Sequence, residues 1–174
     1  MEPTRWLTDG EQEVWRRTLA VLTLLPNEIE GQLQRDADLT RFGYGVLASL
    51  SEAPGRSRRM SELAALANGS QSRLSHLVGR LERRGWVRRE RADDDGRGSV
   101  AVLTDAGYAH LAASAPGHVA LVRSLVFDAL TPAQVAQLGK ITAALLARLD
   151  PIGDCPASPG RDGSAASARA RPSC

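Results

Sequence analysis

Arginine side chains crowd the middle of this 174-residue chain, and they are its clearest candidates for binding chemistry. Eleven arginines and six acidic residues lie between Arg56 and Arg97, a local balance of +5, whereas the whole chain carries +2. A guanidinium group forms paired hydrogen bonds with phosphate oxygens or with a guanine edge. This concentration favours nucleic-acid binding, although high genomic G+C content would also explain why Lys140 is the only lysine.

A predicted helix over residues 71–84 carries several of these arginines. Its apolar residues recur at helical spacing and would face a core: Leu74, Leu77, Val78 and Leu81. Its other faces are polar and carry Gln71, Ser72, Arg73, Ser75, His76, Arg80 and Arg83. A solvent-exposed helix without any ligand shows the same division, so the pattern alone does not establish DNA binding.

The polar side chains of this helix suit the major groove of DNA, which admits a helix and shows a distinct pattern for each base pair. Arg73 and Arg80 could reach base edges or phosphates, and Gln71 could read adenine. Ser70 and Ser72 could bond phosphate oxygens near the positive end of the helix.

A β-hairpin is predicted to follow, with strands over residues 87–91 and 99–103 and a polar turn between them. Arg97 would lie at its tip, where it could contact the DNA backbone or a narrow minor groove. The acidic run 93–95 lacks the alternating oxygen ligands and final glutamate of a calcium loop, so we expect no metal and no cofactor.

The elements that must hold this helix and hairpin begin with a long helix over residues 8–35. Thr8 and Glu11 have capping-box spacing, and apolar residues then recur at helical intervals. Pro26 should kink or break this helix. Asp38 is expected to cap a second helix that ends near Ala53.

Three further helices are expected from their capping residues. Ser61 should cap a short helix over residues 62–67, and Thr104 should cap one that Pro116 bends or breaks. Thr131, followed by a proline, should start the last helix, which runs to about residue 149. The tail, 150–174, is rich in Gly, Pro, Ser and Ala, holds both cysteines, and is predicted to be disordered.

The expected elements follow in the order helix, turn, helix, hairpin and helix. This order predicts a mainly α fold with a small β-hairpin wing. Such a fold is a winged helix-turn-helix, here with a helical dimerisation arm. The expected regions are an N-terminal dimerisation arm (8–35), the DNA-binding region (38–104, with recognition helix 71–84 and wing 87–103), C-terminal dimerisation helices (105–149) and the tail (150–174).

Several stretches resemble the MarR family of transcriptional regulators: Met60–Ala64, Ser72–Leu77, Arg80–Val87 and Leu103–Gly107. Asp94–Gly98 is similar to the wing-tip Asp-x-Arg motif of that family, with Asp95 and Arg97 in the motif positions. The resemblance extends from about Trp6 to Leu149. Gly43 and Gly45 depart from the family pattern and suggest a looser second helix.

This resemblance implies a homodimeric repressor that binds a pseudo-palindromic operator in double-stranded DNA and is released by a small ligand. Asp95 would brace the wing while Arg97 contacts DNA. The predicted DNA-binding residues are Ser70, Gln71, Ser72, Arg73, Ser75, His76, Arg80, Asp95 and Arg97. A cleft between the dimer arm and the DNA-binding region could hold the ligand, with Trp15, Arg16, Tyr44 and His118 as candidate contacts.

Two other classes of function compete with DNA binding as explanations of this sequence, a protein-binding module and an enzyme. A helical module that binds protein and not DNA would explain the helices but not the arginine excess. An enzyme is not expected, because the sequence has no Gly-rich phosphate loop, metal-ligand quartet or nucleophile elbow. No signal core or membrane-length apolar run occurs, so a cytoplasmic protein with no membrane contact is expected.

Overall fold

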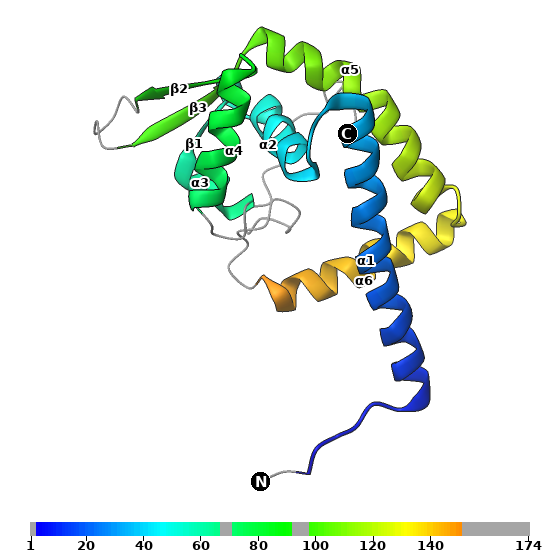
Figure 1. Ribbon diagram of the computed structural model, residues 1–174. Helices are drawn as coiled ribbons and strands as arrows, with labels where there is room; N and C mark the ends of the chain where they lie inside the picture. Colours follow the sequence, from blue (N-terminus) through cyan, green and yellow to red (C-terminus); the bar gives the residue numbers. More distant parts are fainter. Residues whose placement is uncertain (1–2, 67–70, 92–97, 151–174) are drawn as a thin grey trace.

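A computed structural model describes residues 3–66, 71–91 and 98–150 (Figure 1). The described chain is mainly helical with one small sheet, which confirms the predicted fold class. Its elements are α1 (Asp9–Ala37), α2 (Arg41–Glu52), the 3-10 turn η1 (Pro54–Arg56), β1 (Ser57–Arg59), α3 (Met60–Leu66), α4 (Gln71–Arg83), β2 (Val87–Arg91), β3 (Ser99–Leu103), α5 (Asp105–Val122), the π-helical turn η2 (Arg123–Phe127) and α6 (Pro132–Leu149). The tail from residue 151 onward lies outside the described residues.

The sheet has three antiparallel strands in the order β1-β3-β2. β2 and β3 form the predicted hairpin, and their register runs from Val87 opposite Leu103 to Arg91 opposite Ser99. β1 was not predicted, and it pairs with β3 so that Ser57 lies opposite Val102. A three-residue strand becomes stable only when a longer strand supplies its hydrogen-bond partners, so its own sequence gave little signal.

One hydrophobic core lies where α2, α3, α4, the sheet, the end of α1 and the start of α5 meet; we call this unit the head. Its fully buried side chains include Leu33, Val46, Leu47, Leu50, Leu63, Leu74, Val78 and Val87. The predicted apolar stripe of α4 is buried against it. The core therefore fixes which face of α4 remains available to a ligand.

Helix α1 runs unbroken through Pro26, so the expected break is wrong. A proline removes one backbone hydrogen bond, and the other bonds of a 29-residue helix are enough to carry it past that gap. Asp38 does not cap α2; it closes α1 in the left-handed region at φ 51°. Thr40 caps α2 instead, and its hydroxyl accepts the Gly43 amide at 2.9 Å.

Helix α3 begins at Met60, so Ser61 lies inside its first turn and is not its cap. Thr104 caps α5 as predicted, since its hydroxyl accepts the Gly107 amide at 3.0 Å. α5 passes Pro116 without a break, so that part of the expectation is wrong for the same reason as in α1, and the expected bend stays a prediction. Thr131 caps α6 with a capping box, as predicted.

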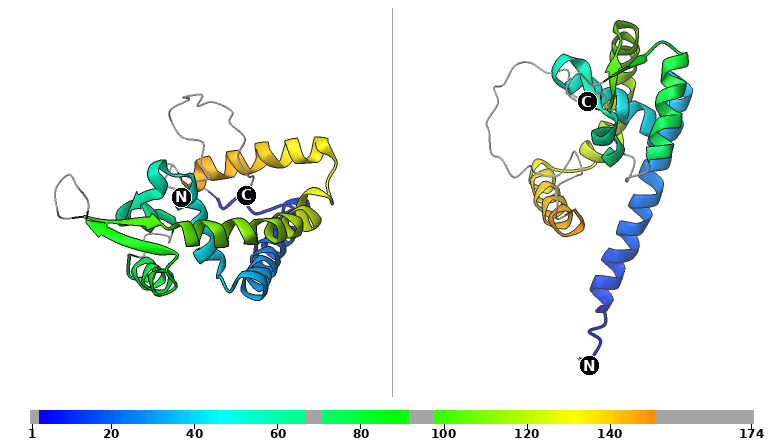
Figure 2. Two further views of the ribbon diagram at one scale, coloured as in Figure 1. Left: turned by 90° about the horizontal axis from the view of Figure 1, so that it is seen from above. Right: turned by 90° about the vertical axis from the view of Figure 1, so that its left-hand side faces the viewer.

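The N-terminal two thirds of α1 extends away from the head, whereas α6 starts beyond the far end of α5 and runs back below the head without packing into its core (Figures 1 and 2). α6 buries no residue, and α1 buries only residues in its last turns: Gln32, Leu33 and Ala37. We call these two extensions, with η2, the arms. The bend between α5–η2 and α6 is 96°.

Candidate nucleic-acid interface

Helix α4 is held on three sides, and this leaves one outward face. The core covers its apolar stripe. The wing flanks a second side, where Arg89 donates to the Ser75 carbonyl at 2.8 Å. The turn between α1 and α2 flanks the third side, where Arg84 donates to the Asp38 carbonyl at 2.7 Å. The face between these flanks is open to a ligand.

Predicted DNA-binding residues divide between this outward face and its edge. Ser72, Arg73, His76 and Arg80 lie on the exposed outward part of the helix. Gln71 and Ser75 are also exposed, but they line a hollow of about 260 Å³ between α4 and the wing, together with Arg89 and Ser99. Ser70, Asp95 and Arg97 lie outside the described residues, so their roles stay predictions.

Arg83 belongs with the outward face, although the predicted contacts omitted it. It follows Ser72 by eleven residues, about three helical turns, which places both on one face. Arg83 is exposed, and within the described residues it makes no hydrogen bond or ion pair. The spacing alone could have identified it in the sequence.

Eight of the eleven central arginines fall into two groups according to their contacts within the described residues. Five of them bind other parts of the protein: Arg56 to Asp105 (3.0 Å), Arg58 to the Ser49 carbonyl (3.1 Å), Arg84 to Asp38, Arg88 to Glu90 (2.6 Å) and Arg89 to Glu82 (3.0 Å). In the part of the chain that the structure describes, Arg80, Arg83 and Arg91 make no such contact. Only part of the local charge excess is therefore available to a polyanion.

A compact joint connects α4 and the wing to α1 and α5. The Trp86 ring stacks on the His110 ring with centroids 3.9 Å apart, and the Arg84 guanidinium lies 4.8 Å from the Trp86 ring centre. His110 Nε2 donates to the Ala37 carbonyl at 2.8 Å. A Cβ at Gly107 would lie 2.1 Å from the Trp86 carbonyl oxygen, so only glycine fits this crossing. These contacts fix the orientation of α4 and the wing relative to α1 and α5.

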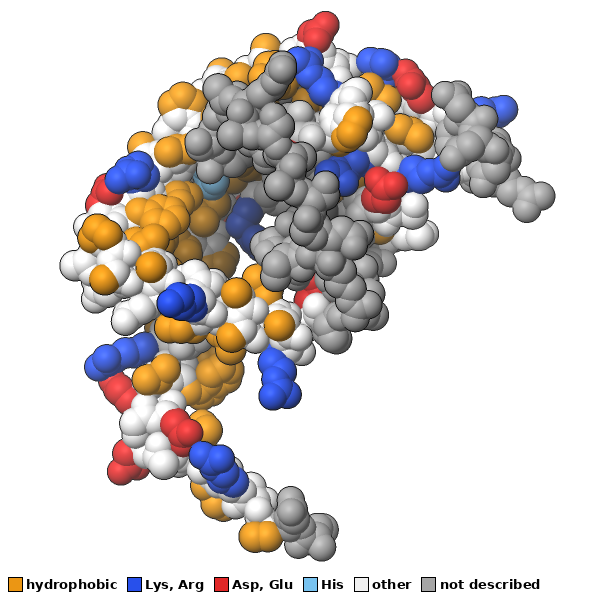
Figure 3. Space-filling view, turned by 180° about the vertical axis from the view of Figure 1, so that it is seen from behind, with side chains coloured by type: hydrophobic (Ala, Val, Ile, Leu, Met, Phe, Trp, Pro, Cys, Tyr) orange, Lys and Arg blue, Asp and Glu red, His pale blue; other side chains and the backbone are white. Residues whose placement is uncertain are grey.

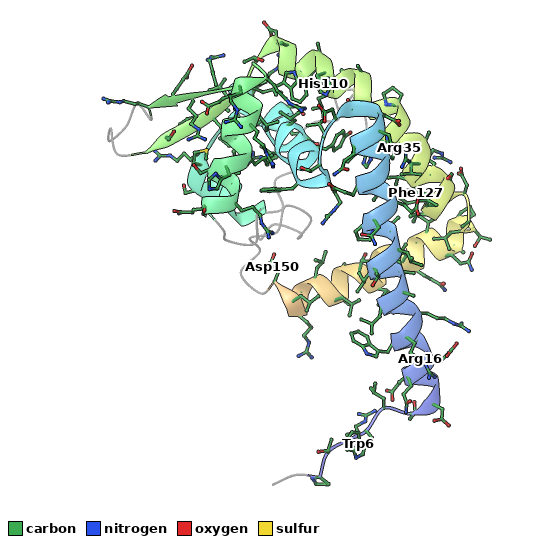
Figure 4. The ribbon with its side chains drawn as sticks, viewed as in Figure 1. Trp6, Arg16, Arg35, His110, Phe127 and Asp150 are labelled. Atoms are coloured by element: carbon green, nitrogen blue, oxygen red, sulfur yellow. The ribbon has the colours of Figure 1, made fainter. Side chains whose placement is uncertain are left out.

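Two of the four candidate effector contacts lie together. The rings of Tyr44 in α2 and His118 in α5 are 4.6 Å apart. Burial lowers the pKa of His118 below its ordinary value. Trp15 and Arg16 are exposed in the N-terminal half of α1, where Figure 4 labels Arg16, whereas only the last turns of α1 are buried against the head. The structure therefore does not bring all four into one cleft.

Gln32 of α1 is a buried polar residue that packs against Gly117, the residue before His118 in α5, since a Cβ at Gly117 would lie 3.3 Å from Gln32 Nε2. Its side chain donates to Asp36 at 2.9 Å, but its Oε1 atom is buried without a hydrogen-bond partner among the described residues. The Nδ1 atom of His118 is also buried and also has no hydrogen-bond partner among the described residues. Such atoms are costly unless water or a polar ligand satisfies them.

The arms expose a broad apolar surface, which Figure 3 shows over α1, α5–η2 and α6. Trp6 and Leu7, just before α1, are also exposed, and the large exposed apolar side chains of the arms are Val14, Trp15, Leu19, Val21, Leu22, Leu24, Leu125, Phe127, Leu138, Ile141, Leu145 and Leu149. A contiguous apolar surface of this kind marks an interaction site.

Residues 3–66, 71–91 and 98–150 hold no group of three or more His, Cys, Asp or Glu side chains placed to bind a metal ion. Of the helices described, none by itself is long and apolar enough to cross a membrane, and only the bent pair of α5–η2 and α6 meets both criteria jointly.

Comparisons with known proteins agree with this geometry. A family model described as the MarR family matches residues 37–98. The transcriptional repressor MprA of Escherichia coli is 32% identical over 107 residues, which span 62% of this chain and 60% of that repressor. The match thus covers less than two thirds of the repressor's length.

Two solved structures are similar over most of their length. Sco3205, a MarR family transcriptional regulator from Streptomyces coelicolor in complex with DNA, is 49% identical with a TM-score of 0.82, over 87% of this chain and 95% of that one. AbsC, a regulator of the same family and organism, is 43% identical with a TM-score of 0.79, over 84% and 98%.

Proposed function

The chain belongs to the MarR family of transcriptional regulators, and from that premise we propose that it binds double-stranded DNA sequence-specifically through α4 and the wing. Members of this family are regulators, which excludes the enzyme class. The observation that carries the proposal is the exposed outward face of α4, where Arg80 and Arg83 have no partner within the described residues. A protein 49% identical to this one has been solved with DNA.

Each proposed contact has a distinct role on DNA. Side chains of the outward face would enter the major groove, where Arg73 and Arg80 read bases or bind phosphates. Arg83, at the end of the helix, would bind the phosphate backbone. Arg97 would contact the backbone or minor groove beside the wing, with Asp95 bracing it. The full proposed set is Ser70, Gln71, Ser72, Arg73, Ser75, His76, Arg80, Arg83, Asp95 and Arg97.

The protein is further proposed to act as a homodimer. Its arms expose large apolar side chains that a single chain leaves uncovered, and a second copy would bury them. A twofold axis would set two α4 helices roughly 34 Å apart, one turn of DNA, to read two half-sites of a pseudo-palindrome. The repressor role rests on its 32% identity with a protein named as a repressor.

A small-molecule effector is proposed to act beside Tyr44 and His118. This pair joins α2 to α5, and Gln32 of α1, which lies against Gly117 next to His118, has a buried oxygen without a hydrogen-bond partner among the described residues. A ligand that prefers one arrangement of these helices would change the spacing of the two α4 helices and so the affinity for DNA. The proposed compartment is the cytoplasm, with no membrane contact.

The proposal is tested by titrating the protein against the DNA upstream of its own gene across a series of salt concentrations. Each phosphate that an arginine neutralises should contribute about −0.9 to the slope of log affinity against log salt. A steep slope supports the proposal, and binding that is absent or independent of salt would overturn it.

A second candidate is a helical module that binds protein and not DNA. The exposed apolar arms favour it, since they would also suit a different protein partner. The same titration separates the two functions, because this module would show no salt-dependent affinity for DNA.

A further inference from the structure

Arg89, in the middle of β2, makes an unusual set of contacts with α4. Its Nη2 donates to the Ser75 carbonyl at 2.8 Å, and its Nε lies 3.0 Å from Glu82 Oε2. Its backbone N–H donates to the other oxygen of Glu82 at 3.1 Å. Both oxygens of one carboxylate are therefore used by one residue of the wing.

These contacts close the open edge of the sheet. β2 is an edge strand, because the sheet order is β1-β3-β2. The Arg89 backbone N–H would otherwise face water, and Glu82 of α4 takes it instead. The guanidinium packs over Gly79, where an added Cβ would lie 3.6 Å from Arg89 Nη2, an ordinary van der Waals contact. The wing is thus fastened along the side of α4.

The positive charge of Arg89 is neutralised by a carboxylate of the same protein. Arg89 and Glu82 are both about two-thirds buried, with side chains 32% exposed, and they neutralise each other. Arg91 offers a matched contrast, because residues two apart on a strand point to the same face. Arg91 is exposed and, in the described ranges, makes no hydrogen bond or ion pair.

We propose that Arg89 is a positioning residue, which with Glu82 clamps the wing at one angle to α4 so that helix and wing reach their DNA grooves together. Arg89 does not itself bind phosphate. This inference rests on the DNA binding proposed above, because the clamp matters only if both elements engage one duplex.

The substitution Glu82→Gln tests the clamp, because the two roles considered for Arg89 predict opposite changes in DNA affinity. The substitution removes a negative charge beside the DNA-binding face, so if Arg89 were simply a cation for DNA, affinity would rise. A broken clamp predicts the opposite, an affinity about tenfold weaker, with the slope against salt unchanged. The measurement is fluorescence anisotropy with upstream DNA across a salt series, together with thermal unfolding to show that the variant is folded.

Two arginine variants complete the comparison. Arg89→Lys keeps the charge but cannot make both side-chain contacts, so it should weaken binding about as much as Glu82→Gln, also without a change of slope. Arg91→Gln is the control, and it should reduce the magnitude of the slope by about 0.9 if that free cation binds a phosphate. Tighter binding by Glu82→Gln, or wild-type affinity in Arg89→Lys, would overturn the clamp.

Amide hydrogen exchange tests the clamp without DNA. Glu82→Gln and Glu82→Ala should both speed exchange in β2 and β3 and leave exchange in α2 as in the wild type. Unchanged exchange in the wing would overturn the clamp even if the protein did not bind DNA. Conversely, absence of DNA binding by the wild type with faster wing exchange in the variants would overturn the proposed function and not the clamp.

Discussion

The head and the arms use the same apolar stripe of α1 in opposite ways. Leu33, in the last turns of the helix, is 0% exposed because the head covers it. Leu22 lies eleven residues earlier on nearly the same face, yet it is 62% exposed. The head is therefore covered within one chain, whereas the arms leave exposed the apolar surface that the proposed dimer would bury. In the head, the side chains that remain available to a ligand are arginines without an internal partner. In the arms, they are exposed leucines and other apolar residues.

Among the substitutions that test this contrast, one in the arms is expected to change DNA affinity the most. Leu22→Glu should leave the head folded, because Leu22 makes no part of its core, but the charge should prevent dimerisation. Loss of bivalent binding should weaken affinity for upstream DNA by about 10²–10⁴-fold. Light scattering after size-exclusion chromatography would give the oligomeric state, and anisotropy the affinity.

Asn27→Glu is the matched control for this arm variant. It places the same charge at an exposed polar position, about 140° round the helix from Leu22. It should keep the dimer and its DNA affinity. A dimeric Leu22→Glu with wild-type affinity would break the comparison between arms and head.

A smaller effect is expected from a single methyl group in the head. Gly107→Ala would place a Cβ 2.1 Å from the Trp86 carbonyl oxygen, and backbone would have to move. Such overpacking costs about 1–3 kcal/mol of unfolding free energy, or more. Gly139→Ala in α6 is the control, since nothing lies within 4 Å of its added Cβ, and it should stabilise by about 0.5–1 kcal/mol. Denaturant unfolding measures both, and equal stabilities would contradict the tight crossing at Trp86.

On the outward face of α4, one free arginine should contribute about tenfold to DNA affinity. Arg83→Ala should weaken binding by about that factor and reduce the magnitude of the salt slope by about 0.9. Arg88→Ala is the control, because Arg88 already pairs with Glu90 at 2.6 Å, and it should change the slope less. If both variants kept the wild-type slope, the division between free and internally bound arginines would have no bearing on DNA.

The smallest effect is expected at His118, where α5 meets α2. Burial lowers the pKa of this ring in the folded state, so protonation favours the unfolded chain. Its contribution to stability is fully present above the ordinary pKa near 6.5 and is lost as pH falls below that value and through the folded pKa. His118→Asn should therefore lose less thermal stability than the wild type between about pH 8 and pH 5, by about 2 °C at most.

His76→Asn is the control for this pH effect, because His76 is exposed on α4. Its melting temperature should follow the wild-type dependence on pH. Parallel curves for wild type and His118→Asn would show that burial of His118 has no cost.

Local patterns were enough to predict most elements of the fold. The spacing of Leu74, Leu77 and their neighbours gave the buried face of α4, and hydroxyl caps at Thr8, Thr104 and Thr131 marked helix starts correctly. These signals work because a helix is held by contacts between residues three or four apart.

Features that depend on distant partners could not be predicted in the same way. Pro26 and Pro116 did not break their helices, because a long helix tolerates one missing hydrogen bond. β1 exists only because β3 lies beside it. The partners of Arg84 and Arg89, which decide whether an arginine is free, come from other elements and leave no trace in local spacing.

The central claim, that the head reads DNA sequence, is tested most directly by a ratio of two affinities at one salt concentration. The dissociation constant for the upstream DNA of its own gene is compared with that for scrambled DNA of equal length and composition. The account predicts that the protein binds the upstream DNA about 10³-fold more tightly or better. A ratio near one would contradict it, because the arginines would then bind any DNA backbone without reading bases.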